Sequence, residues 1–148
     1  MSQSTVNAQD VLSSVRLFHG LDHKHIAQIA RTAHVRTYAP GEEVVREGEE
    51  GIGLYAIASG EVEVFQTKDG QERPLRTMHT GEAFGELSLL AKHSRTATVR
   101  ATQETECLVF TAWNFKAMLD ESPEIAVPLA STLAAWLIES EDRAAAVR

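Results

Sequence analysis

Short alternating segments broken by glycine turns fill residues 34–82, and this texture limits the folds open to the chain. Turn signals that recur roughly every eight to twelve residues are typical of an all-β sandwich or barrel. In residues 61–64, Val alternates with Glu, which gives a strand with one buried and one solvated face. Asp69-Gly70 suits a tight hairpin turn. The other turn signals are Pro40-Gly41, Gly48, Gly60 and Gly81. A β-rich core is therefore predicted for residues 34–111.

Apolar residues at helical spacing precede this β-rich region. They recur at steps of three and four residues in residues 11–18 and again in residues 26–30, with Asp22 placed to cap the second segment. Helices are therefore expected within residues 11–33, after a polar, mobile tail over residues 1–10. The histidines of this region have no cysteine or carboxylate cluster beside them, so no metal site is expected there.

A second helical pattern follows the β-rich region, over residues 112–148. Ser122-Pro123-Glu124 is a good helix start, but Pro128 would then lie beyond the first turn, so a kink or a restart is expected near Val127. The apolar stripe that follows must bury against the β-rich core, the same helix of a second copy, or a ligand. Its members are Leu129, Leu133, Trp136 and Leu137.

Composition narrows the classes of function. A chain of 148 residues with 43% hydrophobic content is enough for one compact domain, residues 1–148. The net charge of −7 argues against broad contact with nucleic acid or acidic membranes. Cys107 is the only cysteine, which excludes an internal disulfide and cysteine-rich metal sites. The first ten residues lack the apolar core of a signal peptide, and the longest apolar run, residues 125–138, is too short for a membrane span. A cytoplasmic location without membrane contact is expected.

Residues 81–101, GEAFGELSLLAKHSRTATVRA, combine groups suited to a small anion. Gly85 allows a close backbone approach or a positive φ, and the short turn after it begins with unpaired N–H groups that favour phosphate. Glu86 can accept hydrogen bonds from sugar hydroxyls. Arg95 offers a planar fork of donors to two phosphate oxygens, with the Thr96 hydroxyl beside it. On its own, such a stretch fits an ordinary β-turn-helix with a surface charge equally well.

Within this stretch, FGELSLLAKHSRTATVRA resembles the phosphate-binding cassette of the cyclic-nucleotide-binding domain family. That family includes catabolite-activator-type regulators, the regulatory domains of protein kinases A and G, and cyclic-nucleotide-gated channels. The resemblance extends to the glycine-rich jelly roll and runs from about Leu17 to about Leu137. It implies an α+β, mainly β fold: a jelly-roll β-roll over residues 34–111, containing the cassette, flanked by N-terminal helices and a C-terminal helical lid.

The same resemblance implies a binding site for cAMP or cGMP and for no further cofactor. Arg95 would neutralise the cyclic phosphate and Glu86 would accept from the ribose. Thr96 matches the residue with which kinase-G-type domains contact guanine, but Ser takes this place in some cAMP-responsive regulators, so both nucleotides stay open. Ser94 departs from the usual Pro or Gly before the arginine, which puts the path of the loop in question. The implied cradle is Gly85, Glu86, Leu87, Ser88, Arg95, Thr96 and Ala97, and the base side is Val64, Arg76 and Met78.

The implied activity is ligand-gated regulation and not catalysis. His93, near Glu86, and Cys107 are the candidate catalytic groups, but one lies in an exposed loop and the other in an apolar strand. Binding would repack the C-terminal helices and act on an unknown protein effector, or on a second copy in a homodimer formed through the last helix. If that helix closes as a lid, Trp136 or Ser140 would cap the base.

Two alternatives stay open. The chain fits the sensor part of a transcription regulator whose DNA-binding domain is missing, because the family often continues into a helix-turn-helix. No recognition helix follows before Arg148, so direct DNA binding by this chain is not expected. The other alternative is a ligand-free interaction domain, against which Gly85, Glu86 and Arg95 argue.

Overall fold

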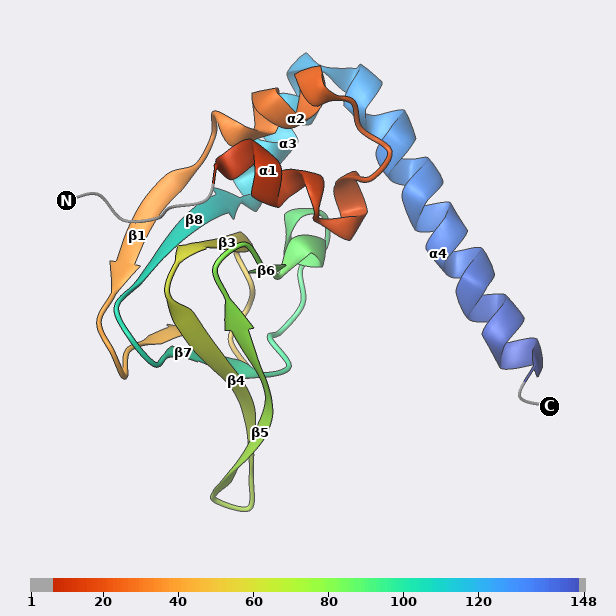
Figure 1. Ribbon diagram of the computed structural model, residues 1–148. Helices are drawn as coiled ribbons and strands as arrows, with labels where there is room; N and C mark the ends of the chain where they lie inside the picture. The colour runs from red at the N-terminus through yellow and green to blue at the C-terminus, as the bar shows by residue number, and fades with distance from the viewer. Residues whose placement is uncertain (1–6, 147–148) are drawn as a thin grey trace.

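Two antiparallel four-stranded sheets form a β-roll in the computed structural model, which describes residues 7–146 (Figure 1). Strands far apart in the sequence lie side by side: residues 34–38 pair with residues 105–109, and residues 43–45 with residues 99–100. One sheet has the order β1 (His34–Tyr38), β8 (Thr105–Thr111), β3 (Gly53–Ser59) and β6 (Ala83–Phe84). The other has the order β2 (Glu43–Val45), β7 (Thr98–Ala101), β4 (Glu61–Lys68) and β5 (Gln71–His79). The expected jelly-roll class, mainly β with flanking helices, is confirmed.

The hairpin of β4 and β5 projects from the roll (Figure 1). Asp69 and Gly70 both have positive φ angles, 53° and 77°, as the tight hairpin turn expected from the sequence requires. β5 is the outer strand of its sheet, and Pro74 lies within it opposite Phe65, where the register shifts. The base of this hairpin forms one wall of the site described below.

The N-terminal helical segment comprises α1 (Ala8–Ser13), the 3₁₀ turn η1 (Arg16–Phe18) and α2 (His23–Ala30). Side chains cap both helices as the sequence favours: Asn7 accepts from the backbone N–H of Gln9, and Asp22 accepts from that of His25. Because Asn7 caps α1, residues 8–10 are helical, which corrects the expectation of a mobile tail through residue 10. Residues 1–6 of that expected tail lie outside the described residues.

The C-terminal helices are α3 (Ala112–Glu121), the 3₁₀ turn η3 (Pro123–Ile125) and α4 (Ala126–Ala146). The restart expected near Val127 occurs at Ala126, directly after η3. Pro128 is then in the first turn of α4, where its missing N–H leaves no intrahelical bond unmade. α4 therefore runs on as one helix of 21 residues.

The largest apolar cluster joins the helices to the β-roll. Phe18 of η1 packs against Phe115 of α3 with ring centroids 6.0 Å apart. A second cluster fills the inside of the roll, where Val62, Val64 and Met78 are buried. The first cluster also includes Val11, Leu12, Leu17, Ile26, Ile29, Leu54, Phe110, Ile125 and Leu129. Burial of these side chains fixes both helical segments against the end of the roll next to the cassette.

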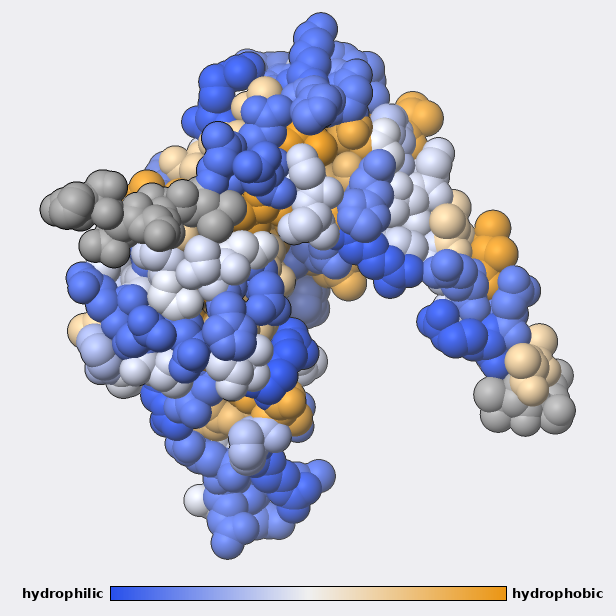
Figure 2. Space-filling model, in the orientation of Figure 1, coloured by the Kyte–Doolittle hydropathy of each residue, from blue (hydrophilic) through white to orange (hydrophobic). Residues whose placement is uncertain are grey.

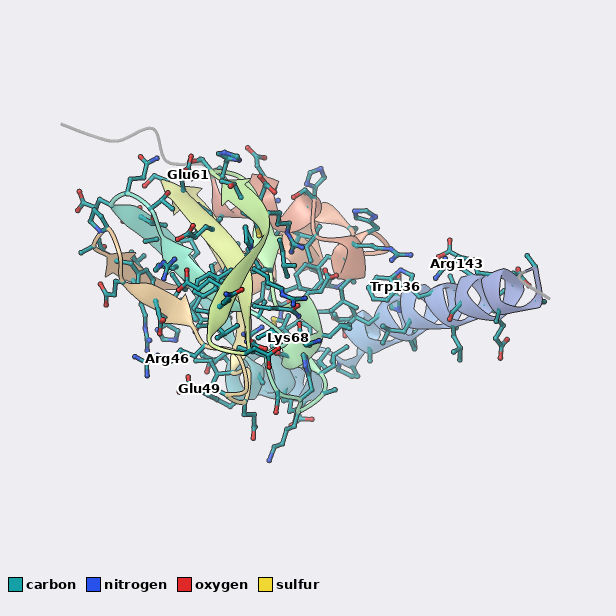
Figure 3. All side chains as sticks on the ribbon, turned by 90° about the horizontal axis from the view of Figure 1, so that it is seen from below. Arg46, Glu49, Glu61, Lys68, Trp136 and Arg143 are labelled. Carbon is teal, nitrogen blue, oxygen red and sulfur yellow. The ribbon has the colours of Figure 1, made fainter. Side chains whose placement is uncertain are left out.

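α4 leaves the body after its first turns and stands clear of it (Figures 1 and 2). Leu129 is buried, whereas Leu137 and Ile138 are exposed further along the helix. Figure 3 shows Trp136 before the free end and Arg143 close to it. Within the described part of the chain, none of the helices has the combined length and hydropathy that crossing a bilayer requires.

Candidate functional site

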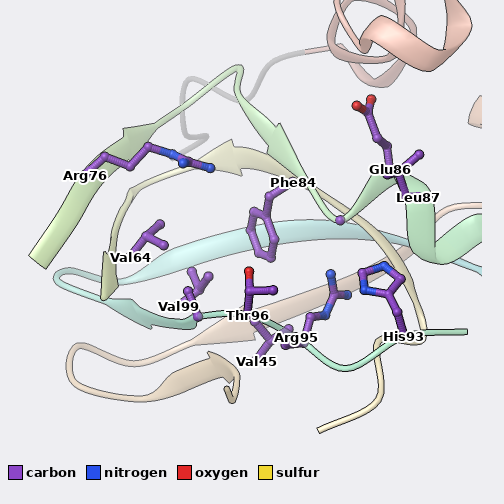
Figure 4. Close-up of a pocket in the computed structure, with 12 residues that line it drawn as sticks. Val45, Val64, Arg76, Phe84, Glu86, Leu87, His93, Arg95, Thr96 and Val99 are labelled. Carbon is purple, nitrogen blue, oxygen red and sulfur yellow. The ribbon is translucent and has the colours of Figure 1, made fainter. Parts of the chain in front are cut away.

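A cavity of about 290 Å³ opens between the cassette and the second sheet (Figure 4). One end is apolar, formed by Val45, Val64, Val99 and Phe84, with Arg76 of β5 above it. Cassette residues form the other end. The cavity is thus amphipathic, with donors and a guanidinium at one end and aliphatic and aromatic surface at the other.

Gly85 begins the cassette wall and is the N-cap of the 3₁₀ turn η2 (Glu86–Leu89). Its φ of 85° is left-handed, a conformation that glycine adopts at little cost. A Cβ at this position would collide with the guanidinium of Arg95 and would lie 2.8 Å from the carbonyl oxygen of Gly53. The sequence therefore needs glycine here both for the turn and for the space that the arginine occupies.

The guanidinium of Arg95 is buried, with only 8% of the residue exposed. Nη2 donates to the carbonyl oxygen of Gly53 at 2.9 Å, and the guanidinium carbon lies 5.7 Å from the ring centroid of Tyr55. Nε has no hydrogen-bond partner among the described residues, and no carboxylate there forms an ion pair with this side chain. Burial lowers the pKa of Arg95 from its usual value. A buried cation with unused donors is the feature expected of an anion site.

Glu86 lies beside the cavity, but its carboxylate points away from Arg95 (Figure 4). Oε2 accepts a hydrogen bond from the backbone N–H of Leu17 in η1, at 3.3 Å. A second hollow on that side is lined by Ser14, Val15, Arg16 and Glu86 together with Arg76 and residues 83–85. In this arrangement the carboxylate bonds to the N-terminal helical segment and not to a group inside the cavity, contrary to the inward orientation that a sugar acceptor implies.

Eight of the residues assigned from the sequence line the cavity: Gly85, Glu86, Leu87, Arg95, Thr96, Ala97, Val64 and Arg76. Ser88 and Met78 do not. Ser88 is buried behind the cassette, where its N–H donates to the Gly85 carbonyl and its Oγ pairs with Nε2 of His93 at 3.2 Å. Met78 faces the interior of the roll, opposite Val62 and packed in the same cluster. Neither side chain reaches the cavity.

Four lining residues were missed by the sequence reasoning: Val45, Phe84, His93 and Val99. Phe84 stacks on Tyr55 with ring centroids 5.2 Å apart, and its position directly before Gly85 was a usable signal. Val99 lies opposite Val64 through the pairing of β7 with β4, a register that no local pattern discloses. His93 lies beside Arg95 in the cassette loop (Figure 4).

The candidate catalytic groups are engaged elsewhere. His93 contacts the Ser88 hydroxyl and, through Nδ1, the Ser94 carbonyl oxygen at 3.2 Å, whereas Glu86 is bonded to Leu17. Burial raises the pKa of the Cys107 thiol to about 12, which keeps it protonated and unreactive. Residues 7–146 contain no group of three His, Cys, Asp or Glu side chains placed to hold a metal ion.

A family model and the similar proteins of known function point to the same domain family. The family model described as "Cyclic nucleotide-binding domain" matches residues 35–122. The Cyclic AMP receptor protein of Thermus thermophilus is 36% identical over 126 residues, which are 84% of this chain and 58% of that protein. Human cGMP-dependent protein kinase 2 is 34% identical over 104 residues, 68% of this chain and 14% of the kinase. The chain thus spans less than two thirds of these relatives.

Among solved structures, the N-terminal domain of a transcriptional regulator from Streptomyces coelicolor A3(2) is similar in fold. It has a TM-score of 0.84 at 32% identity and covers 90% of this chain and 94% of that one. The Thermus thermophilus Catabolite Activator Protein has a TM-score of 0.67 at 34% identity, covering 89% of this chain and 62% of that one. These likenesses include the helices as well as the β-roll.

Proposed function

This chain belongs to the cyclic nucleotide-binding domain family, and from that premise we propose that its cavity binds a purine cyclic nucleotide and relays binding through α4. The observation that carries the proposal is the buried guanidinium of Arg95, which has no carboxylate partner among the described residues and unused donors beside the cavity. A cyclic phosphate supplies one negative charge and two oxygens in the geometry that this fork of donors prefers.

The rest of the cavity suits the remainder of such a ligand. Val45, Val64 and Val99 offer an apolar surface for the flat face of a base, and Phe84 lies beside them. Apolar walls with a few directed polar groups are the usual make-up of small-molecule sites. The proposed ligand is therefore anionic at the Arg95 end and aromatic at the valine end.

Arg76 favours guanine over adenine. Its side chain lies over the apolar end and forms no hydrogen bond or ion pair within residues 7–146. Guanine presents two acceptors, N7 and O6, on one edge, which is the pattern that a guanidinium binds in bidentate fashion, whereas adenine places an N–H₂ donor at the second position. The Thr96 hydroxyl also lines the cavity. Of the two nucleotides left open by the sequence, we therefore favour cGMP.

Isothermal titration calorimetry with cGMP, cAMP and non-cyclic GMP tests this proposal. We expect both cyclic nucleotides to bind, with cGMP tighter by about fivefold or more, since one good bidentate contact is worth roughly 1–3 kcal/mol and this one is partly solvated. Arg76→Ala should bring the two affinities together, while Arg73→Ala, the same charge loss on the same strand outside the cavity, should not. Absence of binding heat with either cyclic nucleotide would refute the site.

The output is proposed to pass through α4 to a protein effector or to a second copy. Leu137 and Ile138 are exposed on the part of α4 that stands clear of the body, so this surface is available to a partner. The likeness to the N-terminal domain of a transcriptional regulator supports a second candidate, the sensor part of such a regulator. Size-exclusion chromatography with light scattering, with and without nucleotide, tests whether the partner is a second copy.

A further inference from the structure

His93 is an ionisable side chain at the Arg95 end of the cavity. Its imidazole lines the cavity and lies beside the guanidinium of Arg95 (Figure 4). Arg76 also lines the cavity, but it lies over the apolar end. One terminal nitrogen of Arg95 already donates to the protein, since Nη2 bonds to the Gly53 carbonyl oxygen at 2.9 Å. A second positive group beside Arg95 would therefore add to the hold on an anion.

The backbone of the loop that carries His93 is held by the segment that precedes β3. The Gly51 N–H donates to the carbonyl oxygen of His93 at 3.1 Å. The Arg95 N–H donates to the Glu49 carbonyl oxygen at 2.8 Å, and the Arg95 carbonyl oxygen accepts from Gly48 at 2.8 Å. These bonds give the loop one defined path, so the place of the imidazole is set by the fold.

Both ring nitrogens of His93 have polar partners. Nδ1 lies 3.2 Å from the Ser94 carbonyl oxygen, which can only accept, so Nδ1 carries a hydrogen. Nε2 lies 3.2 Å from Oγ of Ser88, and a hydroxyl can either donate or accept. The neutral ring therefore accepts from Ser88, and the protonated ring donates to it after the hydroxyl hydrogen has rotated. Both charge states fit the same ring position.

The charged side chains near His93 come from its own loop, from the start of η2 and from the segment paired with the loop. They are Lys92, Arg95, Glu86, Glu49 and Glu50. The Glu86 carboxylate points away from the cavity and bonds to Leu17. Within residues 7–146, no carboxylate forms an ion pair with this imidazole, whereas His25 and His79 have such partners. A phosphate would thus supply the anion that a protonated His93 lacks.

We propose that His93 binds the phosphate of the nucleotide together with Arg95 and takes up a proton from the solvent as the nucleotide binds. The inference rests on the proposed function, because it assigns His93 to the phosphate of the same ligand. Histidine is the side chain whose charge ordinarily changes between pH 5 and pH 8. The like charge of Arg95 disfavours the imidazolium before binding, and the phosphate favours it afterwards. Binding and protonation therefore support each other.

The sign of the pH dependence is a consequence of linkage. If the bound nucleotide favours the protonated ring, then the protonated ring must bind the nucleotide more tightly by the same factor. The cyclic phosphodiester stays a monoanion throughout the range in which histidine titrates, so the charge of the ligand does not change. Affinity should therefore rise as the pH falls through that range.

Calorimetric titration with cGMP at pH 8.0, 6.5 and 5.5 is the direct test. From the first pH to the last, we expect the dissociation constant of wild type to fall by about threefold to tenfold, because the added charge is on an exposed side chain. His93→Gln keeps hydrogen-bonding groups without the charge, so its dissociation constant should change by less than about 1.5-fold. His19→Gln is the matched control, an exposed histidine outside the cavity, and should keep the wild-type profile.

His93→Lys separates a charge effect from a structural one. Lysine stays charged over this range, so the variant should bind at pH 8.0 about as tightly as wild type does at pH 5.5, with little further change on acidification. A merely structural role of His93 would not be restored by lysine.

Proton uptake gives a readout that needs only the wild type. Binding heats measured at pH 6.5 in PIPES and in bis-Tris, whose enthalpies of protonation differ, yield the number of protons taken up per nucleotide. We expect roughly a few tenths of a proton for wild type and for His19→Gln, and about none for His93→Gln.

The outcomes separate the two proposals. A wild type that binds neither cyclic nucleotide at any of the three pH values refutes the proposed function. A wild type that binds equally well at all three and takes up no proton leaves the site intact and overturns the role of His93. A pH dependence that His93→Gln retains belongs to another group and overturns it too. A pH dependence absent from His93→Gln, with tighter binding by His93→Lys at pH 8.0, supports the inference.

Discussion

Arg95 and Arg100 lie five positions apart on either side of the start of β7 and occupy opposite electrostatic environments. Arg100 donates from Nε to Glu63 at 2.7 Å and from both terminal nitrogens to Glu72 at 3.0 and 2.9 Å, with its guanidinium carbon 4.3 Å from the Phe65 ring. These hydrogen bonds, that to Glu72 first, raise the pKa of Arg100. Burial instead lowers the pKa of Arg95.

The difference separates a structural cation from a binding one. Arg100 has its charge balanced within the chain, so it ties β4, β5 and β7 together and leaves nothing for a ligand. Arg95 is more deeply buried yet has no acidic partner among the described residues, so the Gly53 carbonyl and the Tyr55 ring offset only part of its desolvation and an arriving anion would offset more. If exposure alone were used to choose the ligand-binding arginine, the less buried Arg100 would be chosen instead of Arg95.

Exchanging each arginine for alanine should give crossed results, and this is the largest effect we expect. Arg95→Ala should weaken cyclic nucleotide binding by about 30-fold or more, since losing the partner of a buried anion costs roughly 2–5 kcal/mol. Arg100→Ala should instead lower the free energy of unfolding by about 1–2 kcal/mol through its lost ion pairs and cation–π contact. Calorimetric titration and urea denaturation of both variants measure the two quantities. Equal losses of affinity would break the distinction between the two residues.

Gly85→Ala tests the same distinction between the two arginines, because it disturbs the surroundings of Arg95 and leaves those of Arg100 unchanged. The new Cβ collides with the guanidinium of Arg95 in a left-handed backbone, so we expect the free energy of unfolding to fall by about 1–3 kcal/mol and nucleotide affinity to fall with it. Gly70→Ala is the control, because Gly70 also has a positive φ but no atom lies within 4 Å of the added Cβ.

Urea denaturation of both glycine variants separates the cost of the backbone from that of the collision. The excess loss in Gly85→Ala over Gly70→Ala reports the displacement of Arg95. If the two variants lose the same stability and Gly85→Ala keeps full affinity, then the glycine serves only the turn.

The smallest effect that we expect is the pH dependence of the stability contributed by the ion pair of Arg100 with Glu72. The hydrogen bonds from Arg100 lower the pKa of Glu72 below its ordinary value of 4.5. A carboxyl with a depressed folded-state pKa stabilises the fold above its unfolded pKa and loses that contribution as the pH falls through the folded value. The melting temperature of wild type should therefore exceed that of Arg100→Met near neutral pH, and the gap should narrow below pH 4.5.

Thermal unfolding followed by circular dichroism from pH 7 to pH 3 measures this gap. Glu72→Gln should reproduce the flatter profile of Arg100→Met. A gap of constant size down to pH 3 would mean that the ion pair contributes no pH-dependent stability.

Local features of the fold and site were predictable from the sequence, and long-range ones were not. The cassette is contiguous, so Gly85 and Arg95 could be assigned from one segment, and both line the cavity. The resemblance assigned both Arg76 and Met78 to the base side, but pairing with β4 sets Met78 opposite Val62 inside the roll and leaves only Arg76 at the cavity. Whether a residue of a strand reaches the cavity or is buried inside the roll depends on the pairing register with residues far away in the sequence.

The orientation of Glu86 was the least predictable feature of the site. Its local motif indicated a sugar acceptor, whereas the bond it makes is to a backbone donor from η1. The starts of the two N-terminal helices were predicted unequally well: Asp22 marked the start of α2 correctly, but the capping role of Asn7 was overlooked and α1 begins earlier than expected. The partner of Glu86 is 69 positions away and outside any local pattern, whereas the partner of Asn7 is two positions away and its capping role was a missed local signal.

Pro74 matters for how this protein behaves when crowded. An outer strand can template the addition of strands from other molecules, the route to fibrils. β5 interrupts that ladder, because Pro74 has no N–H to donate and Glu72, Arg73 and Arg76 surround it with charge. Leu75 is half-exposed at this edge, yet an incoming strand would meet a broken row of donors. We therefore expect the outer edge of this hairpin to resist the addition of strands from other molecules in concentrated solution.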